Sequence, residues 1–88
     1  MPRLRRFSSR QLIQALHGFG FKVESMKGSH AKFVRETDEG RREVLIAPLT
    51  DPLAIRTISA IYRQASRFIP REELRAAFFT PPEKSSQA

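Results

Sequence analysis

The segment Lys27-Gly28-Ser29-His30-Ala31-Lys32 holds the residues of this chain best suited to chemistry on a phosphodiester. An imidazole can remove a proton from a ribose 2′-hydroxyl, and ammonium groups can offset the charge that develops on the attacked phosphate. Gly28 lets the backbone approach a ligand, because it carries no side chain. A Gly-Ser-His tripeptide is a weak signal by itself, so a surface histidine in a basic strand is the alternative.

Other kinds of catalytic centre find little support in the sequence. The chain has no cysteine, which excludes a disulfide scaffold, a thiolate zinc site and a cysteine nucleophile. It also lacks the G-x-G-x-x-G and G-x-S-x-G patterns, and its two histidines have no carboxylate cluster near them. We therefore expect neither a metal nor a cofactor. His17 falls in the last turn of a predicted helix, where we expect a structural role.

The positive charge is concentrated in one part of the chain, which has 88 residues and a net charge of +7. Residues 1–35 contain eight basic groups and one acid, whereas residues 36–88 contain eight of each. This asymmetry favours nucleic acid as a partner, with an anionic membrane or an acidic protein as alternatives.

No segment indicates a membrane span or a secretory signal. The longest apolar stretch, residues 44–47, is far below the roughly 20 residues that a membrane span needs. The basic N-terminus lacks the apolar segment of a signal peptide. Because the absence of cysteine also fits a reducing compartment, we expect a cytoplasmic protein without membrane contact.

A helix is predicted to begin after Ser8. The Ser8 side chain can accept a hydrogen bond from the Gln11 amide while the Gln11 side chain reaches back, which is a capping box. Phe7 and Leu12 have the spacing of a hydrophobic staple. Apolar residues at helical spacing continue toward Gly18, the predicted C-cap.

Three strands are predicted after this helix, over residues 21–27, 30–36 and 41–48. The short links Gly28-Ser29 and 37–40 make them an antiparallel meander. Alternation puts His30 and Lys32 on one face of the second strand and Phe33 on the other. Because Phe33 is bulky and apolar, we expect its face to pack against the helices and the His30 face to stay open.

A second helix with Thr57 as its N-cap and a short third helix from Pro70 complete the order. The second helix is expected to bury apolar residues at helical spacing, namely Ile58, Ile61, Tyr62 and Ala65. Leu74 and Phe78 are expected to pack the third helix against the rest of the domain.

The order α-β-β-β-α plus a short C-terminal helix predicts an α+β fold. Its three-stranded antiparallel sheet with helices on one face is the layout of double-stranded-RNA-binding domains. We expect one domain over residues 1–79 and a flexible tail over 80–88.

Five short motifs lie in order along the chain: Ser8-Ser9-Arg10-Gln11-Leu12-Ile13 with Leu16, Gly18-Phe19, Lys27-Gly28-Ser29-His30 with Lys32-Phe33, Val44 to Pro48, and Thr57-Ile58 with Ile61-Tyr62-Arg63-Gln64-Ala65. In this order and spacing they resemble HicA-type toxins, the YcfA-like mRNA interferases of HicAB toxin–antitoxin systems. The resemblance implies a double-stranded-RNA-binding-domain-like fold, cleavage of mRNA, catalysis by His30 and a cognate HicB-type antitoxin as partner.

Three functions stay open at this point. The first is a metal-independent ribonuclease toxin in which His30 is catalytic and Lys27, Gly28, Ser29 and Lys32 bind RNA. The second is a non-catalytic RNA-binding module of the same fold, which recognises charge and A-form shape. The third is an interaction protein whose basic surface docks an acidic partner. For the first, the sequence names no second proton-transfer group.

Overall fold

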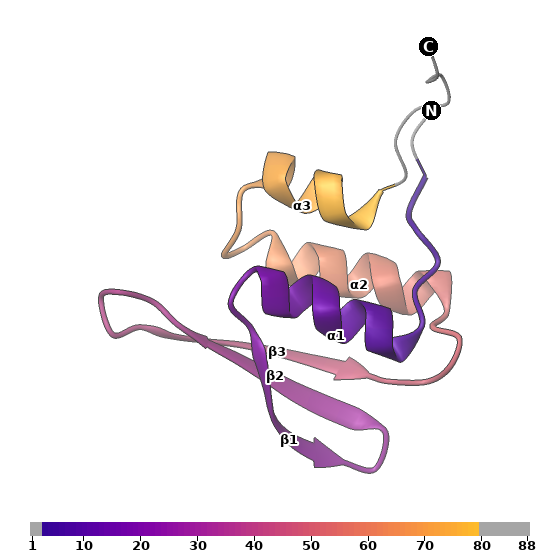
Figure 1. Cartoon of the computed structure of the whole chain (residues 1–88), viewed down its shortest axis with the longest axis horizontal. Helices are drawn as coiled ribbons and strands as arrows, with labels where there is room; N and C mark the ends of the chain where they lie inside the picture. Colours follow the sequence, from indigo (N-terminus) through magenta and orange to yellow (C-terminus); the bar gives the residue numbers. More distant parts are fainter. Residues whose placement is uncertain (1–2, 80–88) are drawn as a thin grey trace.

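The structure is a computed structural model that describes residues 3–79, with three strands in one antiparallel sheet of order β1-β2-β3. The strands are β1 (Lys22–Lys27), β2 (His30–Glu36) and β3 (Arg42–Pro48), and the helices are α1 (Ser9–Gly18), α2 (Ile55–Ala65) and α3 (Arg71–Phe78). All three helices lie on one side of the sheet, and α3 lies beyond α2 (Figure 1). This arrangement confirms the predicted α+β fold with the layout of a double-stranded-RNA-binding domain.

Small differences from the sequence pattern lie at the strand ends. The first and third strands each begin one residue later than predicted, which is within the usual variation of element boundaries. The tail predicted for residues 80–88 lies outside the described residues, and the domain limits of 1–79 stay a prediction.

The first turn of α1 is capped by two separate groups. In the predicted capping box, Ser8 Oγ accepts from the Gln11 amide at 3.2 Å and Gln11 Oε1 accepts from the Ser8 amide at 3.0 Å. Asp51 adds a cap from the loop before α2, because its carboxylate accepts from the Ser9 amide at 2.6 Å and the Ser9 hydroxyl at 2.9 Å. These bonds hold the pKa of Asp51 below its ordinary value. This stabilisation is therefore present at neutral pH and is lost as the pH falls through the lowered pKa.

The predicted start of α2 is wrong. The helix begins at Ile55, and Ala54 is its N-cap without a side-chain cap, so Thr57 lies inside the first turn. Leu53 is buried, and its amide donates to the Phe7 carbonyl at 3.1 Å. This hydrogen bond fixes the chain just before α2. The helix therefore starts before Thr57, the residue with the best capping side chain.

The end of α1 also differs from the prediction. Gly18 is the last helical residue and Phe19 is the C-cap. The left-handed conformation falls at Gly20, which has φ 95° and donates its amide hydrogen to the His17 carbonyl at 2.9 Å. A Cβ at Gly20 would meet Arg35 Cδ at 3.1 Å, so both conformation and space favour glycine here.

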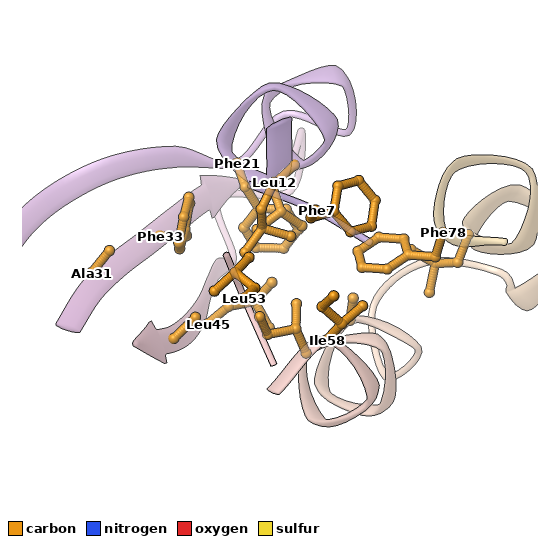
Figure 2. Packing of buried hydrophobic residues seen from close by; sticks show 14 of the residues in the cluster. Phe7, Leu12, Phe21, Ala31, Phe33, Leu45, Leu53, Ile58 and Phe78 are labelled. Atoms are coloured by element: carbon orange, nitrogen blue, oxygen red, sulfur yellow. The ribbon is translucent and has the colours of Figure 1, made fainter. Parts of the chain in front are cut away.

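The hydrophobic core lies between the sheet and the helices (Figure 2). Strand β2 sends Ala31 and Phe33 into it, both with 0% exposure, which confirms the predicted helix-facing side. Phe7 and Phe78 pack edge to face with ring centroids 5.4 Å apart, and Leu74 of α3 is buried as predicted. Four apolar residues are predicted to be buried on the second helix. Ile58, Ile61 and Ala65 are buried, and Tyr62 is half-buried.

Arg35, on the helix-facing side of β2, joins four segments of the chain. Its Nε donates to Glu43 Oε1 on β3 at 2.8 Å, and Nη2 lies 2.6 Å from the same oxygen. The two terminal nitrogens also donate to the carbonyls of Phe19 at 3.0 Å and Phe68 at 3.2 Å. The guanidinium lies 5.0 Å from the centroid of the Phe21 ring. These contacts fix β2 and β3 to the turns that follow α1 and α2.

Replacing Arg35 with alanine should lower the free energy of unfolding by about 3 kcal/mol, since Glu43 would stay buried without its cation. The matched control is Arg42→Ala, which removes an exposed ion pair and should cost less than about 1 kcal/mol. Urea unfolding monitored by circular dichroism measures both. Equal losses in the two variants would contradict the joining role of Arg35.

Candidate functional site

In the described part of the chain, the face of the sheet away from the helices is open (Figure 1). The predicted site residues lie on this face or in the turn at its end. His30 is exposed and Lys32 is half-buried, and both lie on this face, as alternation along β2 predicts. The strand register places Lys27 of β1 on one side of His30 and Pro48 of β3 on the other. Directly opposed residues have Cβ atoms about 4.5–5.5 Å apart, so the Lys27 and His30 side chains are neighbours.

Gly28 and Ser29 form the two-residue turn between β1 and β2. Gly28 has φ 60°, and the described non-glycine residues all have negative φ, which is the φ pattern of a type II′ turn. The Ser29 carbonyl accepts from the Leu49 amide at 2.6 Å, so the turn is tied to the end of β3. The turn itself is exposed, and it fixes the point at which His30 enters the strand.

A β-bulge interrupts β1. Val23 opposes Phe33, but the next pair joins Ser25 to Lys32, so Glu24 is an extra residue on this strand. The sequence pattern predicts the strand without the bulge. One signal was present: Phe21, just before the strand, and Val23 are two residues apart, but Val23 and Met26 are three apart, which breaks strict alternation.

The bulge determines which β1 side chains reach the open face. Beyond it, Met26 opposes Ala31 and Lys27 opposes His30. A shift of one residue exchanges the two faces of a strand. Without the bulge, Met26 would therefore oppose His30, and Lys27 would turn toward the helix side. The bulge thus delivers the Lys27 ammonium to the face of His30.

Lys32 shares an acidic partner with Arg42 of β3. Lys32 Nζ lies 3.4 Å from Glu24 Oε1, and Arg42 Nη2 donates to Oε2 of the same carboxylate. The hydrogen bond from Arg42 is the main cause that holds the pKa of Glu24 below its ordinary value, and Lys32 lowers it further. The carboxylate is therefore charged at neutral pH. The sequence analysis missed both Glu24 and Arg42, because their pairing depends on register across strands.

The structure brings Lys27, Gly28, Ser29 and His30 together at one end of the open face, with Lys32 about 7 Å further along β2. Within residues 3–79, neither the His30 ring nor the Lys27 ammonium has a hydrogen bond or an ion pair. An exposed imidazole beside an ammonium group can move a proton at a substrate hydroxyl while the cation faces a phosphate.

Other features of the described part of the chain bear on alternative chemistries. Among residues 3–79, no group of three or more His, Cys, Asp or Glu side chains is placed to hold a metal ion. In the same range, no helix has both the length and the apolar character to cross a membrane. His17 is exposed in the last turn of α1, on the helix side of the sheet and away from the face of His30.

Comparison with known proteins identifies the family. A family model described as the HicA toxin of bacterial toxin–antitoxin systems matches residues 9–66, about two thirds of the chain. The match runs through α1, all three strands and α2, so it includes the open face and leaves out α3. Searches among curated proteins and among solved structures find no match. Because the matched segment is most of the chain, this protein belongs to the HicA family of toxins from bacterial toxin–antitoxin systems.

Proposed function

We propose that this toxin is a ribonuclease that cleaves mRNA with His30 as its catalytic residue. The observation that carries the proposal is the position of His30, exposed on the open face and directly opposite Lys27. Membership of a toxin family supports an activity that harms the host cell. Within residues 3–79 no helix covers the open sheet face, so an RNA strand can reach the imidazole past this part of the chain (Figure 1).

The chemistry is a transesterification within the RNA chain. The His30 imidazole takes the proton of a ribose 2′-hydroxyl, and the 2′-oxygen attacks the adjacent phosphorus. The bond from phosphorus to the 5′-oxygen breaks, and this oxygen receives a proton from the protonated His30 or from water. The Lys27 ammonium offsets the charge that develops on the phosphate. Gly28 and Ser29, at the exposed turn, let the RNA backbone lie close to the sheet.

Replacing His30 with alanine should lower the rate of RNA cleavage about 10²–10⁴-fold, because it removes the proton-transfer group. The matched control is His17→Ala, which removes an exposed histidine on the helix side and should keep the full rate. Both variants, purified by the same route, are assayed on labelled RNA, and circular dichroism verifies that they are folded. Cleavage by His30→Ala at the unmutated rate would show that another residue or a contaminant is responsible.

RNA binding without cleavage by the unmutated protein would instead favour the non-catalytic RNA-binding module. If the protein does not bind RNA at low salt, the remaining function is that of an interaction protein that docks an acidic partner.

Cleavage should be unaffected by a chelator. We propose a metal-independent reaction, because the proton transfer and the charge compensation come from His30 and Lys27. The cleavage rate is measured in excess EDTA and compared with the rate in added Mg²⁺ or Mn²⁺. A loss of activity in EDTA that a divalent ion restores would contradict this mechanism.

We further propose that a cognate HicB-type antitoxin inhibits the toxin by covering the open face. The toxin–antitoxin family supports the existence of such a partner. Cations and an exposed aliphatic side chain (Ile46, 47% exposed) lie together on this face, which suits a partner with acidic groups around an apolar contact.

Hydrogen exchange of the toxin with and without its antitoxin tests the location of this interface. We expect protection over residues 27–35 and in β3, the strands that carry the open face. Protection confined to α2 and α3, with residues 27–35 still exchanging freely, would contradict inhibition by direct occlusion.

A further inference from the structure

The middle of the open face holds one carboxylate between two cations. Glu24 faces Lys32 Nζ at 3.4 Å with one oxygen and Arg42 with the other. Arg42 and Glu24 also line a hollow of about 360 Å³, together with Gly20, Lys22, Val34 and Glu36. This hollow lies on the open face, at the end of the sheet away from His30. At that end Lys22 pairs with Val34, and Glu36 pairs with Arg42.

A carboxylate and a phosphodiester offer the same kind of ligand to a cation, an anionic oxygen. A phosphate that contacts Lys32 or Arg42 must therefore displace Glu24 or share the cation with it. The side chains of all three residues are 39–48% exposed. Exposed ion pairs of this kind are weak, so the carboxylate weakens phosphate binding without preventing it.

We propose that Glu24 is an internal competitor for RNA phosphate, which lowers the affinity of the open face for RNA and favours close phosphate contact at the Lys27 end beside His30. This inference rests on the proposed function, because it takes RNA as the substrate. The β-bulge is its structural basis, since Glu24 and Ser25 both oppose Lys32. Glu24 is then a specificity-determining residue, because it favours the position of the RNA strand that puts a phosphate next to the His30 imidazole.

The competition predicts that removing the charge of Glu24 strengthens RNA binding. Glu24→Gln should raise the affinity for single-stranded RNA about fivefold, the scale of one exposed ion pair. It should also steepen the log–log salt dependence by about 0.7 for each phosphate newly neutralised. The matched control is Glu36→Gln, which removes the same charge from the same hollow but has no ion pair in the described chain. We expect it to change affinity less than about twofold.

Binding is measured by fluorescence anisotropy with a labelled RNA, in a His30→Ala background so that the RNA stays intact. A double-mutant cycle with Lys32→Ala makes the test specific. Lys32→Ala should weaken binding little when Glu24 is present and severalfold in combination with Glu24→Gln, because only then does Lys32 contact phosphate without competition. Glu24→Ser provides a second, shorter substitution, and circular dichroism verifies that each variant is folded.

The outcomes separate this inference from the proposed function. If the His30→Ala protein binds no RNA at low salt, the substrate assignment fails and the inference fails with it. If it binds RNA, but the Glu24 substitutions leave affinity unchanged or match Glu36→Gln, Glu24 is no competitor and the ribonuclease proposal still stands. A rise in affinity for both Glu24 variants, with non-additivity toward Lys32→Ala, supports the competition.

Discussion

An arginine on the helix side of the sheet joins the sheet to the helix layer of this small domain. The Arg35 guanidinium donates to Glu43 and to two backbone carbonyls, and it also lies over the face of the Phe21 ring. A largely buried charge is tolerated only when it is paired in this way. Arg35 fixes the C-terminal end of β2 to the turns that follow α1 and α2. The opposite face of the strand therefore points away from the helices. His30 therefore lies on the face away from the helices, because Ala31, Phe33 and Arg35 of the same strand pack on the helix side.

The two edges of the sheet are protected in different ways from pairing with another strand. On β3, the Gln64 side chain accepts from the Ile46 amide at 3.4 Å and donates to the Ile46 carbonyl at 3.2 Å, so α2 closes this edge locally. On β1, all six residues are exposed, and a bulge breaks the regular edge. A bulge with charged neighbours discourages pairing with a foreign strand. The same bulge places Lys27 beside His30, so one local irregularity protects the edge and shapes the candidate site.

Local signals predicted most of the fold, and interactions across the sheet account for what they missed. The capping box at Ser8 and the alternation along β2 involve neighbours in sequence, and both are confirmed. Thr57 was assigned a cap that it does not make, because the helix start is set by the anchoring of Leu53 to a distant segment. Register across strands brings Glu24 to Arg42, 18 residues away, and periodicity carries no information about such a pair. The catalytic role of His30 comes from its chemistry and the family motif, and it stays a proposal.

The net charge of the chain is a poor measure of the charge that a ligand meets at His30. The excess in residues 1–35 suggests a broad basic surface, but several of its members are already engaged. Arg35 is paired with Glu43, Lys32 shares Glu24 with Arg42, and Arg5 donates to the Ala77 carbonyl at 3.3 Å beside α3. Lys27, opposite His30, has no ion pair within the described residues. Because Coulomb interactions between exposed groups are screened beyond about 10 Å, this nearby ammonium has more influence on a phosphate at His30 than the distant arginines. For the proposed RNA binding, the cations that are left uncompensated therefore matter more than the number of cations that the chain contains.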